Sequence, residues 1–443
     1  MSAIINFAKF IGDGGESKRL VPLKLLYFIH YMAFSTQTFL PMYFDTKAGF
    51  DKVQIGVLLA LPCICAIVSP PLWGVAADIS HQKTVHILCL ITAALCMFLM
   101  QYVHSFFLMC IVFFLANFQM QPTFSLLDQV GMQMLDRVGG DYGKQRLYGA
   151  VGYGIGGYMA GVIAAAVGIA WCFNMVVALS CISLYLLVAY IPSHDRSHVE
   201  VEFWQSMKAI LKQRDVLMLF ILVVVIGIAS QLIDSFLFLY YFNLTGDNSN
   251  FVGVVIAVET ISELPLFFHA NAIIKRVGTA RCIFLTIAAY AIRFFTYSIV
   301  QNPWMALPIE ALHGITFGLA WAVFTNYVYQ SAPAGTEGTM IGLLAAVQKG
   351  IGGGSGTLIG GWIYEHYGAR TMWSVALFGV LPVAFLIAVA FSFLSTSYVA
   401  KTDTVELDEL MPLQPLTPSF SGVSPRTAHT YKEVDQTSGP SAA

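Results

Sequence analysis

Long apolar segments alternate with short polar ones along most of this chain of 443 residues. An apolar stretch of about 20 residues is long enough to cross the hydrocarbon core of a bilayer as an α-helix. Twelve segments meet this condition, at 22–44, 53–76, 84–102, 105–133, 145–167, 169–191, 216–242, 251–274, 280–300, 304–330, 339–363 and 371–397. The pattern therefore predicts an all-α polytopic membrane protein with twelve transmembrane helices.

Two polar stretches interrupt this pattern. Residues 192–215 carry Trp204, Met207, Ile210 and Leu211 at helical spacing, which predicts a helix lying on the membrane surface. Residues 398–443 are rich in Ser, Thr and Pro, which is typical of a disordered segment. The predicted parts are a cytosolic N-terminal segment at 1–21, a six-helix half at 22–191, a cytosolic linker at 192–215, a second six-helix half at 216–397 and a disordered cytosolic tail at 398–443.

The two halves repeat each other. The stretch "PLWGVAADISHQKTVHILCL" begins at Pro71, and the similar stretch "PLFFHANAIIKRVGTARCIFL" begins at Pro265. A second pair, "YGIGG" at Tyr153 and "KGIGG" at Lys349, is separated by nearly the same number of residues as the first pair. Matches at one spacing indicate a duplicated six-helix unit, as in transporters that rock one half against the other around a central site. The glycine-rich spans at 145–167 and 339–363 are then equivalent, and their small residues fit either tight static packing or a moving interface.

Composition and charge support this interpretation. Hydrophobic residues make up 57% of the chain and charged residues only 11%, which excludes a water-soluble globular domain. With the N-terminus inside, eighteen Lys and Arg fall on the cytosolic side and three on the other, so both termini are expected in the cytosol. Basic blocks interleaved with aromatic residues are absent, so we expect no nucleic-acid partner.

Several charged residues fall inside the predicted spans. A charge at the bilayer centre costs roughly 2.5 to 3.5 kcal/mol, so each should face the interior of the bundle and have a partner or a function. The carboxylates are Asp128, Asp234, Glu259, Glu263 and Glu310, and the cations are Arg146, Arg293 and Lys349. Two carboxylates therefore lack a fixed cation. Burial favours their protonated form, which suits proton coupling.

Glu259 and Glu263 are four residues apart and share one helix face. We expect one of them to hold a solute or Arg293 and the other to load a proton. The alternative is a purely structural pair held by Arg293 and neighbouring hydroxyl groups. His313 follows Glu310 by three residues and is either a proton relay or a structural histidine. Lys349 is expected to pair with Asp234 or Glu310.

The stretch "GVAADISHQK" at 74–83, with Gly74 and Asp78, resembles the cytosolic loop signature of the major facilitator superfamily. The resemblance extends over about residues 20 to 397 and implies the twelve-helix major facilitator fold. It also implies that the loop takes part in the conformational change.

Within that superfamily the chain resembles the lactose-permease-like branch of proton symporters, which includes sugar and nucleoside carriers. "YGKQRLYGAVGYG" at 142–154 is similar to the start of that branch's fifth span, which implies a substrate-binding arginine at Arg146 and a stacking aromatic at Tyr153. The resemblance further implies substrate or charge-network roles for these matching positions: Asp128, Asp234, Glu263, Arg293, His313 and Lys349.

Two positions depart from that branch. A lysine of its tenth span is replaced by Glu310, and its proton-carrying glutamate is replaced by Thr316. Either the proton site has moved, to Glu259 or Glu310, or coupling is lost.

The sequence thus predicts a secondary active transporter, a proton symporter of a neutral polar solute that is sugar-like or nucleoside-like. An uncoupled facilitator or exporter of the same fold, and a membrane receptor or scaffold without transport, are the alternatives. We expect no enzyme activity, because motifs such as HExxH and GxSxG are absent. The eight cysteines form no CxxC pair, so we expect no metal and no cofactor. The expected partners are the solute, protons and the lipid bilayer, around a monomer.

The tail suggests a location. "ELDELM" at 406–411 has the acidic-then-leucine form of a sorting signal to endosomal or vacuolar membranes, although such short patterns also arise by chance. The expected host is therefore the plasma membrane or an endosomal or vacuolar membrane.

Overall fold

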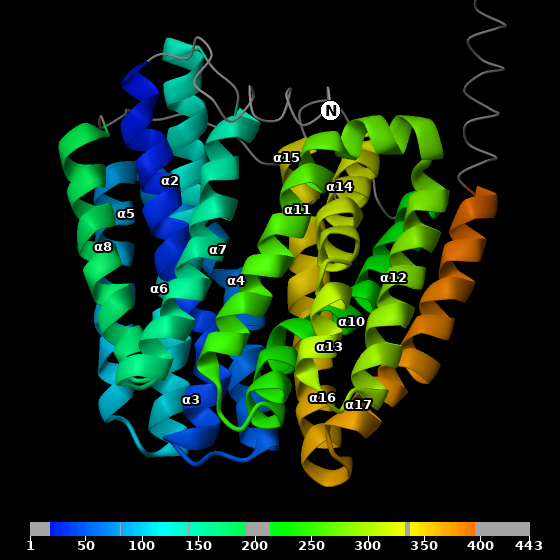
Figure 1. The fold of residues 1–443 in the computed structure, drawn as a ribbon. Helices are drawn as coiled ribbons and strands as arrows, with labels where there is room; N and C mark the ends of the chain where they lie inside the picture. The colour runs from blue at the N-terminus through cyan, green and yellow to red at the C-terminus, as the bar shows by residue number, and fades with distance from the viewer. Residues whose placement is uncertain (1–17, 80, 140–141, 192–212, 333–336, 395–443) are drawn as a thin grey trace, which may run out of the picture. The chain divides into compact units, whose positions relative to one another are not determined.

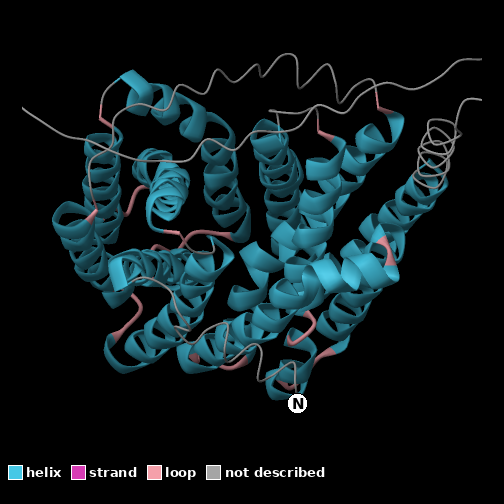
Figure 2. Ribbon diagram, turned by 90° about the horizontal axis from the view of Figure 1, so that it is seen from above, coloured by secondary structure: helices cyan, strands magenta, loops and turns pink. Residues whose placement is uncertain are grey.

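The computed structural model describes residues 18–79, 81–139, 142–191, 213–332 and 337–394. Every secondary-structure element in these residues is a helix (Figures 1 and 2). The predicted surface helix around Trp204 to Leu211, most of the linker, the tail with its acidic-leucine pattern and nearly all of the N-terminal segment lie outside the described residues.

The helices coincide closely with the predicted spans. The first part of the chain forms α2 (Val21–Phe34), η2 (Ser35–Phe39), α3 (Leu40–Thr46), α4 (Lys52–Ile79), α5 (Gln82–Leu99), α6 (Phe106–Val138), α7 (Tyr142–Val167) and α8 (Trp171–Tyr190). The second part forms α10 (Arg214–Leu244), α11 (Ser249–Val277), α12 (Thr279–Ile299), α13 (Pro303–Glu310), η4 (Gly314–Leu319), α14 (Ala320–Ser331), α15 (Glu337–Ala345), η5 (Ala346–Gly353), α16 (Gly354–Tyr367), α17 (Ala369–Val375) and η6 (Ala376–Val380).

Ten of these segments are long and apolar enough to cross a membrane, by length and composition. The other two predicted spans, 22–44 and 339–363, are also helical throughout but are more polar. The first contains the run "STQT", and the second contains "QKGIGGGSG". Polar side chains and glycines lower the mean hydropathy of both segments, and such residues are placed in membrane helices where they face other helices or a cavity.

The two most extensive contacts between the halves follow the predicted repeat. Helix α7 packs on α11, and α16 packs on α4. Figure 1 shows α7 beside α11. The duplication makes α4 equivalent to α11 and α7 equivalent to α16, so the two contacts are related by the same pseudo-symmetry. A pair of halves joined by two equivalent seams can rock about the line between them.

Glycines permit the closest approach at both seams. A Cβ atom on Gly56 of α4 would lie 2.7 Å from the Thr357 carbonyl oxygen of α16, and Gly361 lies against Gly56 in turn. At the other seam, a Cβ atom on Gly161 would lie 2.7 Å from the Ser249 carbonyl oxygen. Backbones that approach this closely leave no room for a side chain, which explains the glycine-rich spans.

The predicted loop at 74–83 is partly helical. Helix α4 continues through Ile79 and therefore includes both Gly74 and Asp78. The expectation of a loop over this stretch is wrong for these residues, because the apolar positions Val75, Ala76, Ala77 and Ile79 let the helix run on. The backbone of Asp78 is described and its side chain is not.

Candidate functional site

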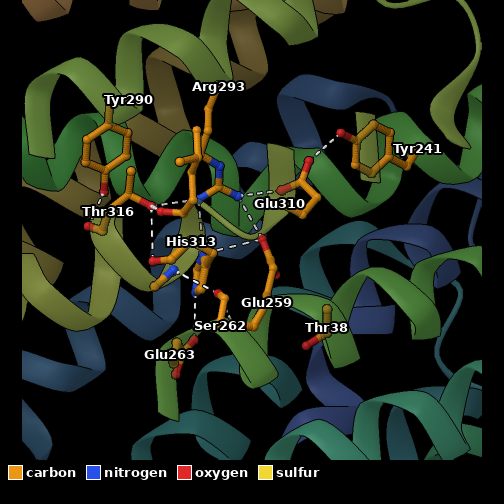
Figure 3. Close-up of polar contacts among 12 residues, drawn as sticks. Thr38, Tyr241, Glu259, Ser262, Glu263, Tyr290, Arg293, Glu310, His313 and Thr316 are labelled. Atoms are coloured by element: carbon orange, nitrogen blue, oxygen red, sulfur yellow. Dashed lines mark hydrogen bonds and ion pairs between the residues drawn. The ribbon is translucent and has the colours of Figure 1, made fainter. Parts of the chain in front are cut away.

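A buried group of charges lies within the second half, where α11, α12, α13 and η4 meet (Figure 3). We call it the Arg293 cluster, and it consists of Glu259, Glu263, Arg293, Glu310 and His313. Arg293 Nη2 donates to Glu259 Oε1 at 2.8 Å and to Glu310 Oε2 at 2.7 Å. The side chain of Arg293 is 1% exposed, that of Glu310 0% and that of Glu259 7%. One guanidinium thus joins two helices through two carboxylates.

Glu310 accepts hydrogen bonds from two tyrosines in addition to its ion pair with Arg293. Tyr241 OH donates to Oε1 at 2.5 Å and Tyr297 OH donates to Oε2 at 2.9 Å, in addition to the bond from Arg293. Arg293 Nε in turn donates to Tyr297 OH at 2.7 Å. Both carboxylate oxygens of Glu310 therefore have hydrogen-bond partners. Full satisfaction of a buried carboxylate limits its desolvation cost.

His313 bridges the two glutamates of α11. Its Nε2 lies 2.8 Å from Glu263 Oε1, and its Nδ1 lies 3.1 Å from Arg293 Nη1 and 3.4 Å from Glu259 Oε1. An arginine N–H can only donate, so Nδ1 must accept from it and the ring proton belongs on Nε2. The hydrogen bonds therefore assign a neutral imidazole that donates to Glu263.

The backbone around this cluster departs from regular α-helix. Helix α13 ends at Glu310, and the π-helical segment η4 runs from Gly314 to Leu319. A second π-helical segment, η5, holds Lys349. Insertions of this kind widen a helix and frequently occur at functional sites. Here the wider turn of η4 places Thr316, whose hydroxyl accepts from Arg293 Nη1 at 2.8 Å, on the same side as His313.

The first half carries a more exposed ion pair. Arg146 Nη1 of α7 donates to Asp128 Oδ2 of α6 at 2.5 Å, and Tyr27 OH of α2 donates to Asp128 Oδ1 at 2.9 Å. The Arg146 side chain is 48% exposed and that of Asp128 is 21% exposed. This pair, eighteen residues apart in sequence, is therefore only partly buried.

Aromatic residues extend from this pair toward the second half. Phe124 makes edge-to-face contacts with Tyr31 and Phe34, at centroid distances of 5.2 and 4.8 Å. Tyr153 OH lies 3.0 Å from Thr38 Oγ1. The next residue, Gly154, touches Thr260, which precedes Ser262 and follows Glu259 on α11. Tyr153 thus lies beside the point where the first half meets the helix that carries the two glutamates.

Lys349 and Asp234 behave differently from the prediction. Both are exposed, and neither has a hydrogen bond or an ion pair with another described residue. The expected pair of Lys349 with Asp234 or Glu310 therefore does not form among the described residues. Glu310 already has Arg293 as its cation, and Asp234 instead lines a small cavity together with Arg293 and His313.

Several residues of the site gave no sequence signal strong enough to single them out. Tyr241 and Tyr297 donate hydrogen bonds to Glu310, and Tyr27 donates one to Asp128. Each of them is one tyrosine among 20 in the chain. The stripe of Tyr27, Tyr31 and Phe34 along one face of α2 could have been found from its helical spacing.

A duplicated helical bundle with charges gathered inside its halves defines the class of secondary transporters. Residues 20–375 match the family model described as the MFS_1 like family, so the chain belongs to this family of major facilitator transporters.

Curated relatives and solved structures agree with this assignment. The chain is 25% identical over 359 residues to the maltose permease of Geobacillus stearothermophilus, covering 80% of this chain and 90% of the relative. It is 21% identical over 408 residues to the nucleoside permease NupG of Escherichia coli strain K12, covering 84% and 94%. The crystal structure of the nucleoside transporter NupG superposes with a TM-score of 0.72 at 20% identity, covering 85% of this chain and 99% of that one. The major facilitator fold predicted from the sequence is confirmed.

Proposed function

We propose that this protein is a proton symporter that moves a neutral polar solute, sugar-like or nucleoside-like, by alternating access. The observation that supports it most directly is the Arg293 cluster, in which one guanidinium contacts two carboxylates and His313, while His313 contacts a third carboxylate, Glu263. This arrangement is short of positive charge, and a proton is the smallest ligand that can supply it. A purely structural cluster would balance its charges without a mobile proton.

The proton moves between Glu259 and Glu263 through His313. Uptake of a proton at Nδ1 from the Glu259 side, followed by loss of the Nε2 proton to Glu263, leaves a neutral ring with its proton on Nδ1. That tautomer can no longer accept from Arg293 Nη1, which lies 3.1 Å away. Proton transfer therefore releases Arg293 from His313 and links protonation to the packing of α11 against α12 and η4.

Solute binds between the halves, on Asp128, Arg146 and Tyr153 from the first and on Glu263 and Lys349 from the second. Charged side chains can make charge-assisted hydrogen bonds to hydroxyl groups. The rings of Tyr31, Phe34 and Phe124 offer flat apolar faces to a solute ring. The names of the maltose and nucleoside permeases support a solute with these features. Several carboxylates at the site disfavour a strongly anionic solute.

The observed conformation fits closure on the outer side. In the orientation with cytosolic termini, the glycine contacts at Gly56 and Gly161 lie toward the outer ends of their helices. Glu365 adds a polar contact there, since its Oε2 accepts from the backbone N–H of Lys52 at 2.8 Å. Arg146, Asp234 and Lys349 remain exposed. These features support a state open to the cytosol.

One observation favours an uncoupled facilitator as the second candidate. Thr316 occupies the place where related symporters have a proton-carrying glutamate, and its hydroxyl is used to bind Arg293. If Glu259 and Glu263 do not exchange protons, the same fold would carry solute down its gradient only.

The test is uptake of labelled sugars and nucleosides into proteoliposomes, with and without an inward proton gradient. The variants are Glu263→Gln and His313→Gln, with Asp247→Asn, an exposed carboxylate outside the site, as the matched control. Symport predicts that the gradient drives accumulation in wild type and the control, and that accumulation is lost in both site variants. If wild type takes up solute equally with and without the proton gradient, the protein is the uncoupled facilitator. A folded protein that moves no member of the panel would overturn the solute class and favour a receptor or scaffold.

A further inference from the structure

A small cavity lies beside the Arg293 cluster, between residues of α10, α12 and η4. Its volume is about 10 Å³, which is close to the smallest space that holds one water molecule. The polar residues that line it are Ser230, Asp234, Tyr290, Arg293, His313 and Thr316. Figure 3 shows the last four of these residues together. A buried water molecule typically makes two to four hydrogen bonds, so a polar lining of this size fits one.

The lining offers hydrogen-bond acceptors, because its donors are already engaged. All five N–H groups of Arg293 have partners, which are Tyr297 for Nε, His313 and Thr316 for Nη1, and Glu259 and Glu310 for Nη2. The Ser230 hydroxyl donates to the backbone carbonyl of Gly227 at 3.1 Å, and the Tyr290 hydroxyl donates to that of Thr316 at 3.1 Å. Their oxygens are left to accept. The occupant of the cavity must therefore donate hydrogen bonds, as water does.

The charge of the lining distinguishes water from a cation. Oxygen acceptors also suit Na⁺, but the Arg293 guanidinium lies in the same wall and repels a cation fixed beside it. A proton is different, because it is handed on through the water to an acceptor and is not held in the cavity. The cavity therefore suits a water molecule that passes a proton.

Asp234 connects this cavity to the solution. Its side chain lines the cavity, yet the residue is exposed and has no hydrogen bond or ion pair with another described residue. Ser230 precedes it by about one turn on the same face of α10. The ionisable groups that act electrostatically on Asp234 are His313, Lys349, Arg293 and Glu263. Among the described residues that line the cavity, Asp234 is the carboxylate that can exchange a proton with the solution.

We propose that this cavity holds one water molecule that carries the proton from His313 to Asp234 and so to the cytosol. The water route rests on the proton symport proposed above and supplies the path by which the proton leaves. Glu263 first returns its proton to Nε2, which makes His313 an imidazolium. The Nδ1 proton then passes to the water, and another proton of that water passes to the Asp234 carboxylate, which releases it to the solution. His313 is left neutral with its proton on Nε2, as in the observed conformation.

The experiment measures two activities of the full chain in proteoliposomes, with the sugar or nucleoside that wild type transports. One is uptake driven by an inward proton gradient, and the other is exchange of labelled for unlabelled solute, which needs no net proton transfer. Asp234→Asn should lower proton-driven uptake by about a hundredfold or more, because an amide cannot take up the proton, and should retain exchange. Asp234→Glu should restore proton-driven uptake.

Two variants at Ser230 test the water itself. Ser230→Leu fills the cavity and leaves Asp234 in place, so it should also lose proton-driven uptake and retain exchange. Ser230→Ala is the matched control, because it leaves the space open, and it should keep both activities. If Ser230→Leu does not fold, Asp234→Asn still decides, because its side chain is exposed and an amide of the same shape fits there.

The outcomes separate the water route from the symport on which it rests. If the proton gradient drives uptake in wild type and equally in Asp234→Asn and Ser230→Leu, the water route is overturned and the symporter stands. If the gradient drives no uptake in wild type, the symporter fails and the route fails with it. Uptake that requires Na⁺ at a constant proton gradient would place a sodium ion in the cavity and overturn the assignment of water.

Discussion

Two arginines inside membrane helices, Arg146 and Arg293, pair with carboxylates in opposite surroundings. Arg146 is 48% exposed and has Asp128 as its ion-pair partner, whereas Arg293 is 1% exposed and binds both Glu259 and Glu310. An exposed pair costs little to separate. A buried pair is costly to break, because the remaining partner stays buried and charged. The comparison teaches that the same type of ion pair, in two halves of one fold, can be partly exposed in one half and fully buried in the other.

The largest effect should come from Arg293→Met. Loss of this guanidinium leaves Glu259 and Glu310 buried without their cation, which should destabilise the fold by about 3–5 kcal/mol. Arg146→Met should cost at most about 1 kcal/mol in the same assay. Thermal unfolding of both variants in one detergent measures the difference. Equal losses of stability would contradict the distinction between the two arginines.

Arg146→Met should instead affect solute affinity. If Arg146 donates a charge-assisted hydrogen bond to solute, its loss should raise KM for uptake by about tenfold to a hundredfold. The concentration dependence of uptake in proteoliposomes measures this. Arg137→Met, which changes an exposed arginine in the last turn of α6, is the matched control and should leave KM unchanged. An unchanged KM in Arg146→Met would remove the exposed pair from the binding site.

A side chain at the seam between the halves should shift the conformational equilibrium. Gly56→Leu places atoms where a Cβ would already lie 2.7 Å from the Thr357 carbonyl, and overpacking of this kind costs typically about 1–3 kcal/mol. This free energy destabilises the conformation in which α4 packs on α16. The ends of these two helices should therefore separate. Spin labels at positions 47 and 367, in a background without other reactive cysteines, should report a longer mean distance.

The matched control is Gly342→Leu, because a Cβ atom at Gly342 of α15 has nothing within 4 Å. A shift of similar size in this variant would show that the change in distance comes from general destabilisation rather than from the seam.

The smallest effect should come from Glu365→Gln. The amide can still accept from the backbone N–H of Lys52, but it lacks the negative charge that favours the N-terminus of α4. The expected loss is about 0.3–1 kcal/mol, which should lengthen the same label distance slightly. If Glu365→Gln lengthens the label distance more than Gly56→Leu does, the polar contact, and not the glycine seam, would be the main contact that holds α4 against α16.

The sequence predicted the helices and the charged residues well. The described residues of all twelve predicted spans are largely helical, and ten of these spans rest on a long local run of apolar residues. The family resemblance assigned substrate or charge-network roles to Asp128 and Arg146, which form an ion pair, and a contact of Glu259 or Glu263 with Arg293 was among the alternatives. The contact of Glu263 with His313 was not predicted. Their roles in transport remain predictions.

The contacts between residues of different helices were harder to predict. Lys349 was assigned to Asp234 or Glu310, but Glu310 takes Arg293 and two tyrosines instead. The π-helical segments η4 and η5 also gave no sequence signal, although η4 carries Thr316, whose hydroxyl accepts from Arg293. An apolar pattern reports which residues avoid water, and it carries no information on the rotation of one helix against another.

Hydropathy, charge and the repeated motifs therefore predicted a duplicated bundle of membrane helices with ionisable groups inside it. Only the tertiary structure decided that Arg293 lies buried among three carboxylates and a histidine while Arg146 stays exposed. The physical reason is that insertion into a membrane depends on the local sum of transfer free energies. The pairing of charges depends instead on distances of a few ångströms between segments far apart in the sequence.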